Sequence, residues 1–217
     1  MKMKNLVSSA VLLMSLSAMA VNASELKVKI TKELASIDVM HNGKSVTIMR
    51  NQDNKNKVNP AFANTSRNCP PFCINPMELA PGVETLGEIE VINYLKKVSD
   101  GDKSTLVIDS RTPDWVKRGT IPGSVNIPWT KLSVRKGADP ITIAEIVVNR
   151  FGAKEIDDDK FDYSNAKTLV MFCNGMWCGQ SPNNIRTLLK MGYPASKIKW
   201  YRGGMQNWEN LGLTTIK

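Results

Sequence analysis

The sequence contains little histidine, little cysteine and few aromatic residues. Its 217 residues include one histidine and four cysteines, and aromatic residues make up 6% of the total. Beyond the first twenty residues there is no apolar stretch of the roughly 20 residues that a membrane-spanning helix needs. A single histidine leaves no histidine cluster for a metal centre, and the Cys-x-x-Cys-His pattern of covalent haem attachment is absent. We therefore expect no metal and no other cofactor.

Positive charge exceeds negative charge along the chain. Twenty-nine lysines and arginines face 20 acidic residues, which gives a formal net charge of +9. A basic surface raises the local concentration of anions. The basic clusters interleaved with aromatic residues that are typical of nucleic-acid binding are missing. The charge therefore favours small anionic substrates over nucleic acid, with a solvated cationic surface as the simpler alternative.

Residues 1–20 have the composition of a secretory signal peptide. Lys2 and Lys4 precede an uncharged, apolar and serine-rich run over residues 6–16. Ala18-Met19-Ala20 then provides a small-x-small cleavage site, and Val21-Asn22-Ala23 provides a second one. The apolar run is short for a membrane span, and no cysteine follows the site to carry a lipid. These features predict a periplasmic protein with a cleaved signal peptide and no stable membrane anchor.

Residues 24–83 form an N-terminal hairpin and a connector rich in cysteine and proline. Residues 37–40 and 45–49 alternate as strands do, and Asn42-Gly43 between them is a strong hairpin turn signal. Because a lone hairpin is marginally stable, it should pack on the main domain or mediate contact with a partner protein or a second copy. Residues 67–83 contain repeated prolines and indicate a rigid connector without regular structure.

Residues 84–217 alternate helix and strand patterns, which predicts one α/β domain. Short apolar strands are expected at 105–109, 124–127, 168–172 and 198–201. A capping box from Thr85 to Glu88 should start the first helix, with an apolar face formed by Ile89, Ile92, Leu95 and Val98. Further helices are expected at 113–117, 140–151, 181–191 and 204–211. This alternation implies a parallel sheet with helices on both faces.

Cys173 is the strongest candidate for a functional residue. It lies at the carboxyl end of the most apolar strand, where parallel sheets bind their ligands. Two glycines in the following loop allow successive N–H groups to turn inward, and the next helix adds its positive N-terminus. A thiol in such a cradle should have a lowered pKa and act as a nucleophile, the alternative being an inert buried cysteine. The residues expected to bind the anionic substrate are Asn174, Gly175, Met176, Trp177, Cys178, Gly179 and Gln180.

The four cysteines form two close pairs, Cys69/Cys73 and Cys173/Cys178. Export would place them where disulfides persist, so both pairs are disulfide candidates. A disulfide is our default for the first pair, because copper(I) binding would need a further ligand that is not evident. In the second pair, Cys178 could resolve a persulfide or sulfenic acid on Cys173, or it could only stabilise the loop. The spacing of the cysteines alone does not decide between these alternatives.

Three motifs in order make residues 84–217 resemble the rhodanese-like domain family. They are Val107-Ile108-Asp109-Ser110-Arg111, the run from Gly119-Thr120-Ile121-Pro122-Gly123 to Pro128, and Gly203-Gly204-Met205 with Trp208 and Gly212. The resemblance implies a rhodanese-like fold and Cys173 as the active-site cysteine. In that family the cysteine takes a sulfane sulfur from a small anionic donor such as thiosulfate. The resulting persulfide passes this sulfur to a thiol or a cyanide-like acceptor.

The sequence departs from the family pattern at several positions. Thr120 stands where the family usually has histidine, and the loop after Cys173 looks about two residues longer and lacks the usual arginine. A longer loop could admit a bulkier substrate. Gly179 replaces the arginine of the Cys-x5-Arg pattern in phosphatases of this fold, which argues against phosphate-ester hydrolysis. Besides a sulfurtransferase, the alternatives are a thiol–disulfide redox protein using Cys173 and Cys178, and a non-catalytic binding module.

Overall fold

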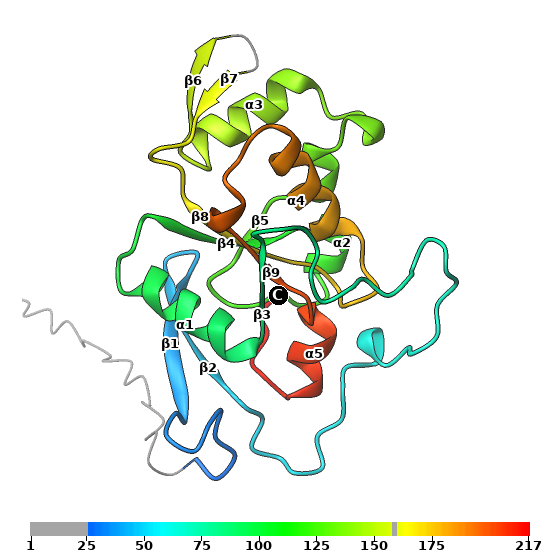
Figure 1. Ribbon diagram of the computed structural model, residues 1–217. Helices are drawn as coiled ribbons and strands as arrows, with labels where there is room; N and C mark the ends of the chain where they lie inside the picture. Colours follow the sequence, from blue (N-terminus) through cyan, green and yellow to red (C-terminus); the bar gives the residue numbers. More distant parts are fainter. Residues whose placement is uncertain (1–25, 158–159) are drawn as a thin grey trace, which may run out of the picture.

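The computed structural model describes residues 26–157 and 160–217 and shows an α/β fold around one parallel sheet (Figure 1). The predicted signal peptide lies outside the described residues. In the sheet, the order is β3-β9-β8-β4-β5, and every neighbouring pair is parallel. The strands are β3 (Glu84–Leu86), β4 (Thr105–Asp109), β5 (Val125–Asn126), β8 (Thr168–Phe172) and β9 (Ile198–Tyr201).

Helices cover both faces of this sheet, as expected (Figure 1). Side chains alternate along β8, so that Leu169 and Met171 join one apolar core while Val170 and Phe172 join the other. The first core packs under α3 and α4, and the second under α1, α5 and the N-terminal hairpin. The helices are α1 (Glu88–Ser99), α2 (Pro113–Val116), α3 (Pro140–Asn149), α4 (Gln180–Lys190) and α5 (Gly204–Asn210). Short 3-10 helices span Pro60–Phe62, Trp129–Leu132, Val134–Lys136 and Ala195–Lys197.

The N-terminal hairpin packs on the main domain. Strands β1 (Ser36–His41) and β2 (Lys44–Met49) pair antiparallel, and Asn42 and Gly43 turn with positive φ, as the Asn-Gly signal predicts. Ile37, Val39 and Ile48 are buried in the core beside α1. The backbone N–H of residue 214 also donates to the carbonyl of Met49 at 3.0 Å. The apolar face of the hairpin is therefore covered by its own chain.

The expected capping box at residues 85–88 is wrong. Thr85 lies in β3 and pairs with Trp200 of β9, so α1 begins only at Glu88, with Gly87 as its N-cap. Pairing with a strand more than a hundred residues away overrides the local helix-start pattern. The buried face of α1 is correspondingly Val91, Ile92 and Leu95, while Ile89 is exposed.

A second hairpin, formed by β6 (Lys154–Asp157) and β7 (Lys160–Asp162), was not predicted. The residues of β6 are all exposed, so its sequence carries no buried alternation to reveal it. The connector over residues 67–83 contains no helix or strand, as expected. Across the residues that the structure describes, no helix is both long and apolar enough to span a membrane.

Candidate active site

The loop that carries Cys173 joins β8 to α4 at the centre of the sheet. Strand β8 ends at Phe172, and α4 begins at Gln180 with Gly179 as its N-cap, one residue before the expected start at Ser181. Because β8 lies between β4 and β9, the loop leaves the carboxyl edge of the sheet with a strand on each side. This is the edge at which ligands bind in parallel α/β sheets.

Cys173 is buried, with 3% of its surface exposed, and polar groups surround its sulfur. The hydroxyl of Ser181 donates to Cys173 Sγ at 3.2 Å, and the thiol lies 3.4 Å from the carbonyl oxygen of Cys178. Trp200 Nε1 donates to Ser181 Oγ at 3.3 Å, which holds that hydroxyl oxygen in place. The first turn of α4 therefore supplies hydrogen bonds to the sulfur.

These surroundings make the two loop thiols differ in acidity. Burial by itself raises the pKa of Cys173, but hydrogen bonds from the Cys178 thiol, the Ser181 hydroxyl and the N–H groups of Ser181 and Gln180 lower it to about 7. Burial and the neighbouring Cys173 raise the pKa of Cys178 well above its usual value. At neutral pH the pair therefore consists of an acidic thiol at 173 and a neutral hydrogen-bond donor at 178.

Helix α5 holds the backbone of the loop. The N–H groups of Met205 and Gln206 donate to the carbonyls of Cys173 and Asn174, each at 2.9 Å. A Cβ on Gly204 would lie 2.3 Å from the Cys173 carbonyl oxygen, so only glycine allows this approach. This contact explains the Gly-Gly-Met motif. Gly204 lets α5 begin close to the loop, and the first N–H groups of α5 then hold the carbonyls of Cys173 and Asn174 in place.

A buried ion pair supports the loop from the other side. The Arg111 side chain is fully buried and pairs with Asp109 at 2.6 Å. Its guanidinium also donates to the Gly119 carbonyl at 2.7 Å and to Asn174 Oδ1 at 3.4 Å. Thr120, which stands where the family usually has histidine, donates its hydroxyl to Asp109 at 2.7 Å. The Asp-x-Arg motif therefore has a structural role. Its ion pair is buried, and its arginine donates a hydrogen bond to Asn174, the second residue of the loop.

The connector lies over the active-site loop. Asn75 donates its backbone N–H to the Met176 carbonyl at 2.8 Å, and its side chain donates to the carbonyls of Met176 and Cys178. Arg202 donates to the Asn75 carbonyl at 2.8 Å. Asn75 and Arg202 were not among the predicted site residues, because no short-range sequence pattern links a connector residue to a loop a hundred residues away.

Trp177 anchors a second contact between the loop and the connector. The ring of Phe72 meets Trp177 edge to face at 5.7 Å, and the guanidinium of Arg67 stacks 3.7 Å from the Trp177 ring centroid. Trp177 Nε1 donates to Gln206 Oε1 at 2.7 Å. These contacts tie the connector, the loop and α5 together.

The predicted site residues adopt different degrees of burial. Asn174, Gly175 and Cys178 are buried with Cys173, whereas Gly179 is exposed; Met176, Trp177 and Gln180 are intermediate. Their role in substrate binding stays a prediction.

The two cysteine pairs differ in redox state. Cys69 and Cys73 form a disulfide, as we expected for this pair, while Cys173 and Cys178 are free thiols. In residues 26–157 and 160–217, no cluster of three or more His, Cys, Asp or Glu residues is arranged to hold a metal ion.

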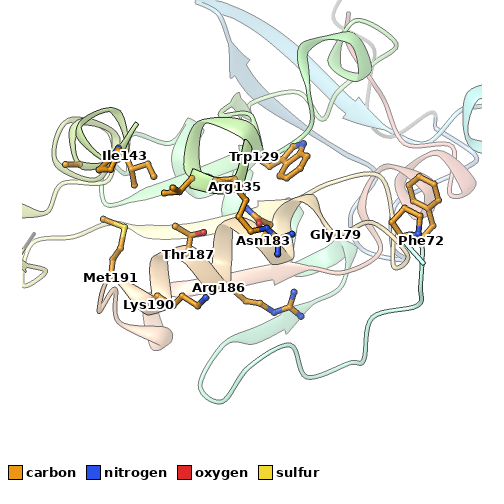
Figure 2. A pocket seen from close by; sticks show the side chains of 15 residues that line it. Phe72, Trp129, Arg135, Ile143, Gly179, Asn183, Arg186, Thr187, Lys190 and Met191 are labelled. Atoms are coloured by element: carbon orange, nitrogen blue, oxygen red, sulfur yellow. The ribbon is translucent and has the colours of Figure 1, made fainter. Parts of the chain in front are cut away.

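A cavity of about 750 Å³ adjoins the loop at Gly179 (Figure 2). Its walls come from α3, α4, the two 3-10 helices between Trp129 and Lys136, and the connector at Pro71 and Phe72. Figure 2 labels side chains from these elements, among them Ile143 of α3, Thr187 of α4 and Phe72 of the connector. The cavity therefore begins where the active-site loop enters α4.

Comparison with known proteins identifies the family. The family model described as "Rhodanese-like domain" matches residues 92–211, more than half of the chain. No curated protein matches the sequence.

Three solved structures illustrate the structural similarity. A protein of unknown function from Rhodopseudomonas palustris, described as a possible tyrosine phosphatase, is 20% identical, with a TM-score of 0.41, over 64% of this chain and 88% of its own. A thiosulfate sulfurtransferase from Pseudomonas aeruginosa is 20% identical, with a TM-score of 0.38, over 62% of this chain and 20% of its own. A human single-domain sulfurtransferase is 20% identical, with a TM-score of 0.33, over 59% of this chain and 96% of its own. On the match over residues 92–211, this chain belongs to the rhodanese-like domain family.

Proposed function

We propose that the protein is a rhodanese-type sulfurtransferase that carries sulfane sulfur on Cys173. The observation that carries this proposal is the position of Cys173 directly after β8, where the Ser181 hydroxyl donates to its sulfur at 3.2 Å and its pKa is lowered to about 7 despite burial. The Cys173 thiolate attacks the outer sulfur of a small anionic donor such as thiosulfate. The sulfur–sulfur bond of the donor breaks, sulfite leaves with the electron pair, and a persulfide anion remains on Cys173.

The groups around Cys173 suit this chemistry. The hydroxyl of Ser181 and the N–H groups at the start of α4 donate hydrogen bonds toward a negative sulfur. These donors are held by the fold before the reaction, so they stabilise the persulfide anion without reorganisation. A thiol or cyanide then attacks the terminal sulfur of the persulfide and regenerates the Cys173 thiolate.

Sulfur transfer from thiosulfate to cyanide tests the proposal. The wild-type protein should form thiocyanate, and incubation with thiosulfate alone should add the mass of one sulfur atom to the intact protein. Cys173→Ser should lose both signals while keeping the same circular dichroism spectrum. Thiocyanate formation by Cys173→Ser would contradict the assignment of Cys173, and its absence in the wild-type protein with every donor would favour a non-catalytic binding module.

A second candidate function is thiol–disulfide exchange by Cys173 and Cys178. The favouring observation is that both cysteines are free and buried in one loop, with the Cys173 thiol 3.4 Å from the carbonyl oxygen of Cys178. Oxidation would join the two sulfurs and remove the nucleophile, giving an inactive form that a dithiol restores. Reduction of insulin should then require both cysteines. Cys178→Ala with full sulfur transfer but no insulin reduction would place Cys178 outside the sulfur-transfer step.

We also propose that the protein is exported to the periplasm with its signal peptide removed. The support is the sequence pattern of residues 1–20, and the disulfide between Cys69 and Cys73 suits an oxidising compartment. N-terminal sequencing of the native protein should begin at Val21 or Ser24. A cytoplasmic species that begins with Met1 would contradict the proposal.

A further inference from the structure

The disulfide between Cys69 and Cys73 lies on the surface of the connector. Both cysteines are exposed, and so are the residues between them. A thiol reagent therefore reaches either sulfur without unfolding the domain. Exposed disulfides are in general easier to reduce than buried structural ones.

This disulfide lies outside the apolar cores of the domain. Its cysteines are only four positions apart, and a disulfide that closes a short ring stabilises a fold less than one that closes a long ring. The connector around it has no helix or strand, and the nearest buried side chains along the chain are Phe62 and Val83. Reduction of the bond should therefore leave the α/β domain folded.

The turn that the disulfide closes also contacts the active-site loop. Phe72, inside the ring, packs edge to face on Trp177 of the loop, with the ring centroids 5.7 Å apart. Besides the disulfide, a hydrogen bond from the Phe72 N–H to the Asn68 carbonyl at 2.9 Å closes this turn. The disulfide is therefore a main restraint on the turn that presents Phe72 to the loop.

Asn75 connects this turn to the thiol of Cys173. It follows Cys73 by two residues, and its Nδ2 donates to the carbonyl oxygen of Cys178 at 3.2 Å. The Cys173 thiol lies 3.4 Å from the same oxygen. Because the connector and the thiol contact one carbonyl group, a displacement of the connector changes the surroundings of Cys173.

We propose that the Cys69–Cys73 disulfide is a second redox-active site, which a dithiol reduces, and that its reduction loosens the connector and makes Cys173 more reactive. The first thiolate of the dithiol attacks one cysteine sulfur, the Cys69–Cys73 bond breaks, and the other cysteine leaves with the electron pair and takes up a proton. The second thiolate of the dithiol then attacks the mixed disulfide and releases the first cysteine. The dithiol is thereby oxidised to a disulfide, and both cysteines become thiols.

A dithiol is the required class of reductant because a monothiol has no second thiol to complete the exchange. The freed cysteine lies beside the mixed disulfide and expels a monothiol by attacking it. The inference rests on the exposure of the disulfide and on the contacts of the connector, and it uses no step of the proposed sulfur transfer.

Selective reduction tests the proposed exchange site. Dithiothreitol should make both Cys69 and Cys73 available to alkylation in the folded protein, as shown by peptide mapping, with an unchanged circular dichroism spectrum. Glutathione at the same thiol concentration should leave the pair oxidised. A bond that opens only after unfolding in urea, or that both reagents open equally, would overturn the proposal.

The reactivity of Cys173 tests the link to the active-site loop. After removal of dithiothreitol, the reduced protein should react with iodoacetamide at Cys173 about fivefold faster than the oxidised protein, the factor expected for loss of one hydrogen bond of average strength. Cys69→Ala combined with Cys73→Ala should show the fast rate without reductant. Asn75→Ala should show it in both redox states. Ile74→Ala is the matched control, because this neighbouring side chain is 74% exposed, and it should respond to reduction as the wild-type protein does.

Equal alkylation rates in the oxidised and reduced proteins would overturn the link between the connector and Cys173. Alkylation needs no sulfur donor, so that result would leave the proposed function standing. A redox-dependent alkylation rate without sulfur transfer from any donor would instead support this inference and overturn the proposed function.

Discussion

Replacing Gly204 by alanine should separate α5 from the active-site loop. Gly204 has a φ of 55°, a left-handed conformation that costs a residue with a Cβ roughly 1–2 kcal/mol. The new Cβ would also lie 2.3 Å from the Cys173 carbonyl oxygen and 2.8 Å from the Gly175 nitrogen. Both are backbone atoms that cannot rotate away, so α5 must retreat.

This displacement of α5 determines how far the free energy of unfolding should fall. It breaks the hydrogen bonds from the N–H groups of Met205 and Gln206 to the loop carbonyls, each worth about 1 kcal/mol. Together with the left-handed strain, we expect the free energy of unfolding to fall by roughly 3–4 kcal/mol. The relaxed loop should also lose its alignment with α4, so the pKa of Cys173 should rise from about 7 toward its usual range.

Urea unfolding and the pH dependence of iodoacetamide alkylation measure these two effects. Gly179→Ala is the matched control, because Gly179 has a φ of −90° and open space where a Cβ would lie. Alanine there should change stability by less than about 1 kcal/mol, because the lower entropy of the unfolded chain is opposed by the preference of an N-cap for glycine over alanine. If Gly204→Ala unfolds at the same urea concentration as Gly179→Ala, with an unchanged alkylation profile, the proposed fixing of the loop by α5 is refuted.

Three further predictions follow from other contacts. Arg111→Ala leaves Asp109 buried and unpaired, so it should lower the free energy of unfolding by about 3–5 kcal/mol in urea titrations; a loss below 1 kcal/mol would contradict a structural ion pair. Ser181→Ala removes a hydrogen bond to the sulfur of Cys173, so the alkylation profile should shift to higher pH, and an unshifted profile would count against this contact. Burial lowers the pKa of His41, whose Nδ1 accepts the Gly123 N–H, so the unfolded chain binds more protons than the native one below pH of about 6.5. Stability should therefore fall as the pH drops below that value, and His41→Asn should flatten the dependence; equal slopes for both proteins would argue against a role for His41.

Local sequence patterns were sufficient to predict the central strands of the sheet. The runs at 105–109, 168–172 and 198–201 are short and apolar and are flanked by polar or turn residues, and they became β4, β8 and β9 with the expected bounds. The Asn-Gly turn likewise predicted the N-terminal hairpin, because positive φ at two successive residues restricts the choice of side chains. Cys173 was placed at the end of the central strand by the same reasoning.

Contacts between distant segments were not readable from the sequence. Thr85 has the local signature of a helix start, yet pairing with β9 made it part of an edge strand. Asn75 has no sequence signature at all, and only the folded chain brings it to the carbonyls of Met176 and Cys178.

The sequence by itself determined the parallel sheet, the family and the position of a candidate nucleophile, because apolar runs, turn residues and short motifs are local properties. The lowered pKa of Cys173 agrees with the sequence-based prediction, and the tertiary structure alone decided the state of Cys178, whose thiol is free and buried and has a raised pKa. Cys173 and Cys178 share one loop and one residue type, and their difference arises from Ser181 and the N–H groups of α4 that point at the first sulfur. Burial and hydrogen-bond direction set a pKa, and both exist only once the chain has folded.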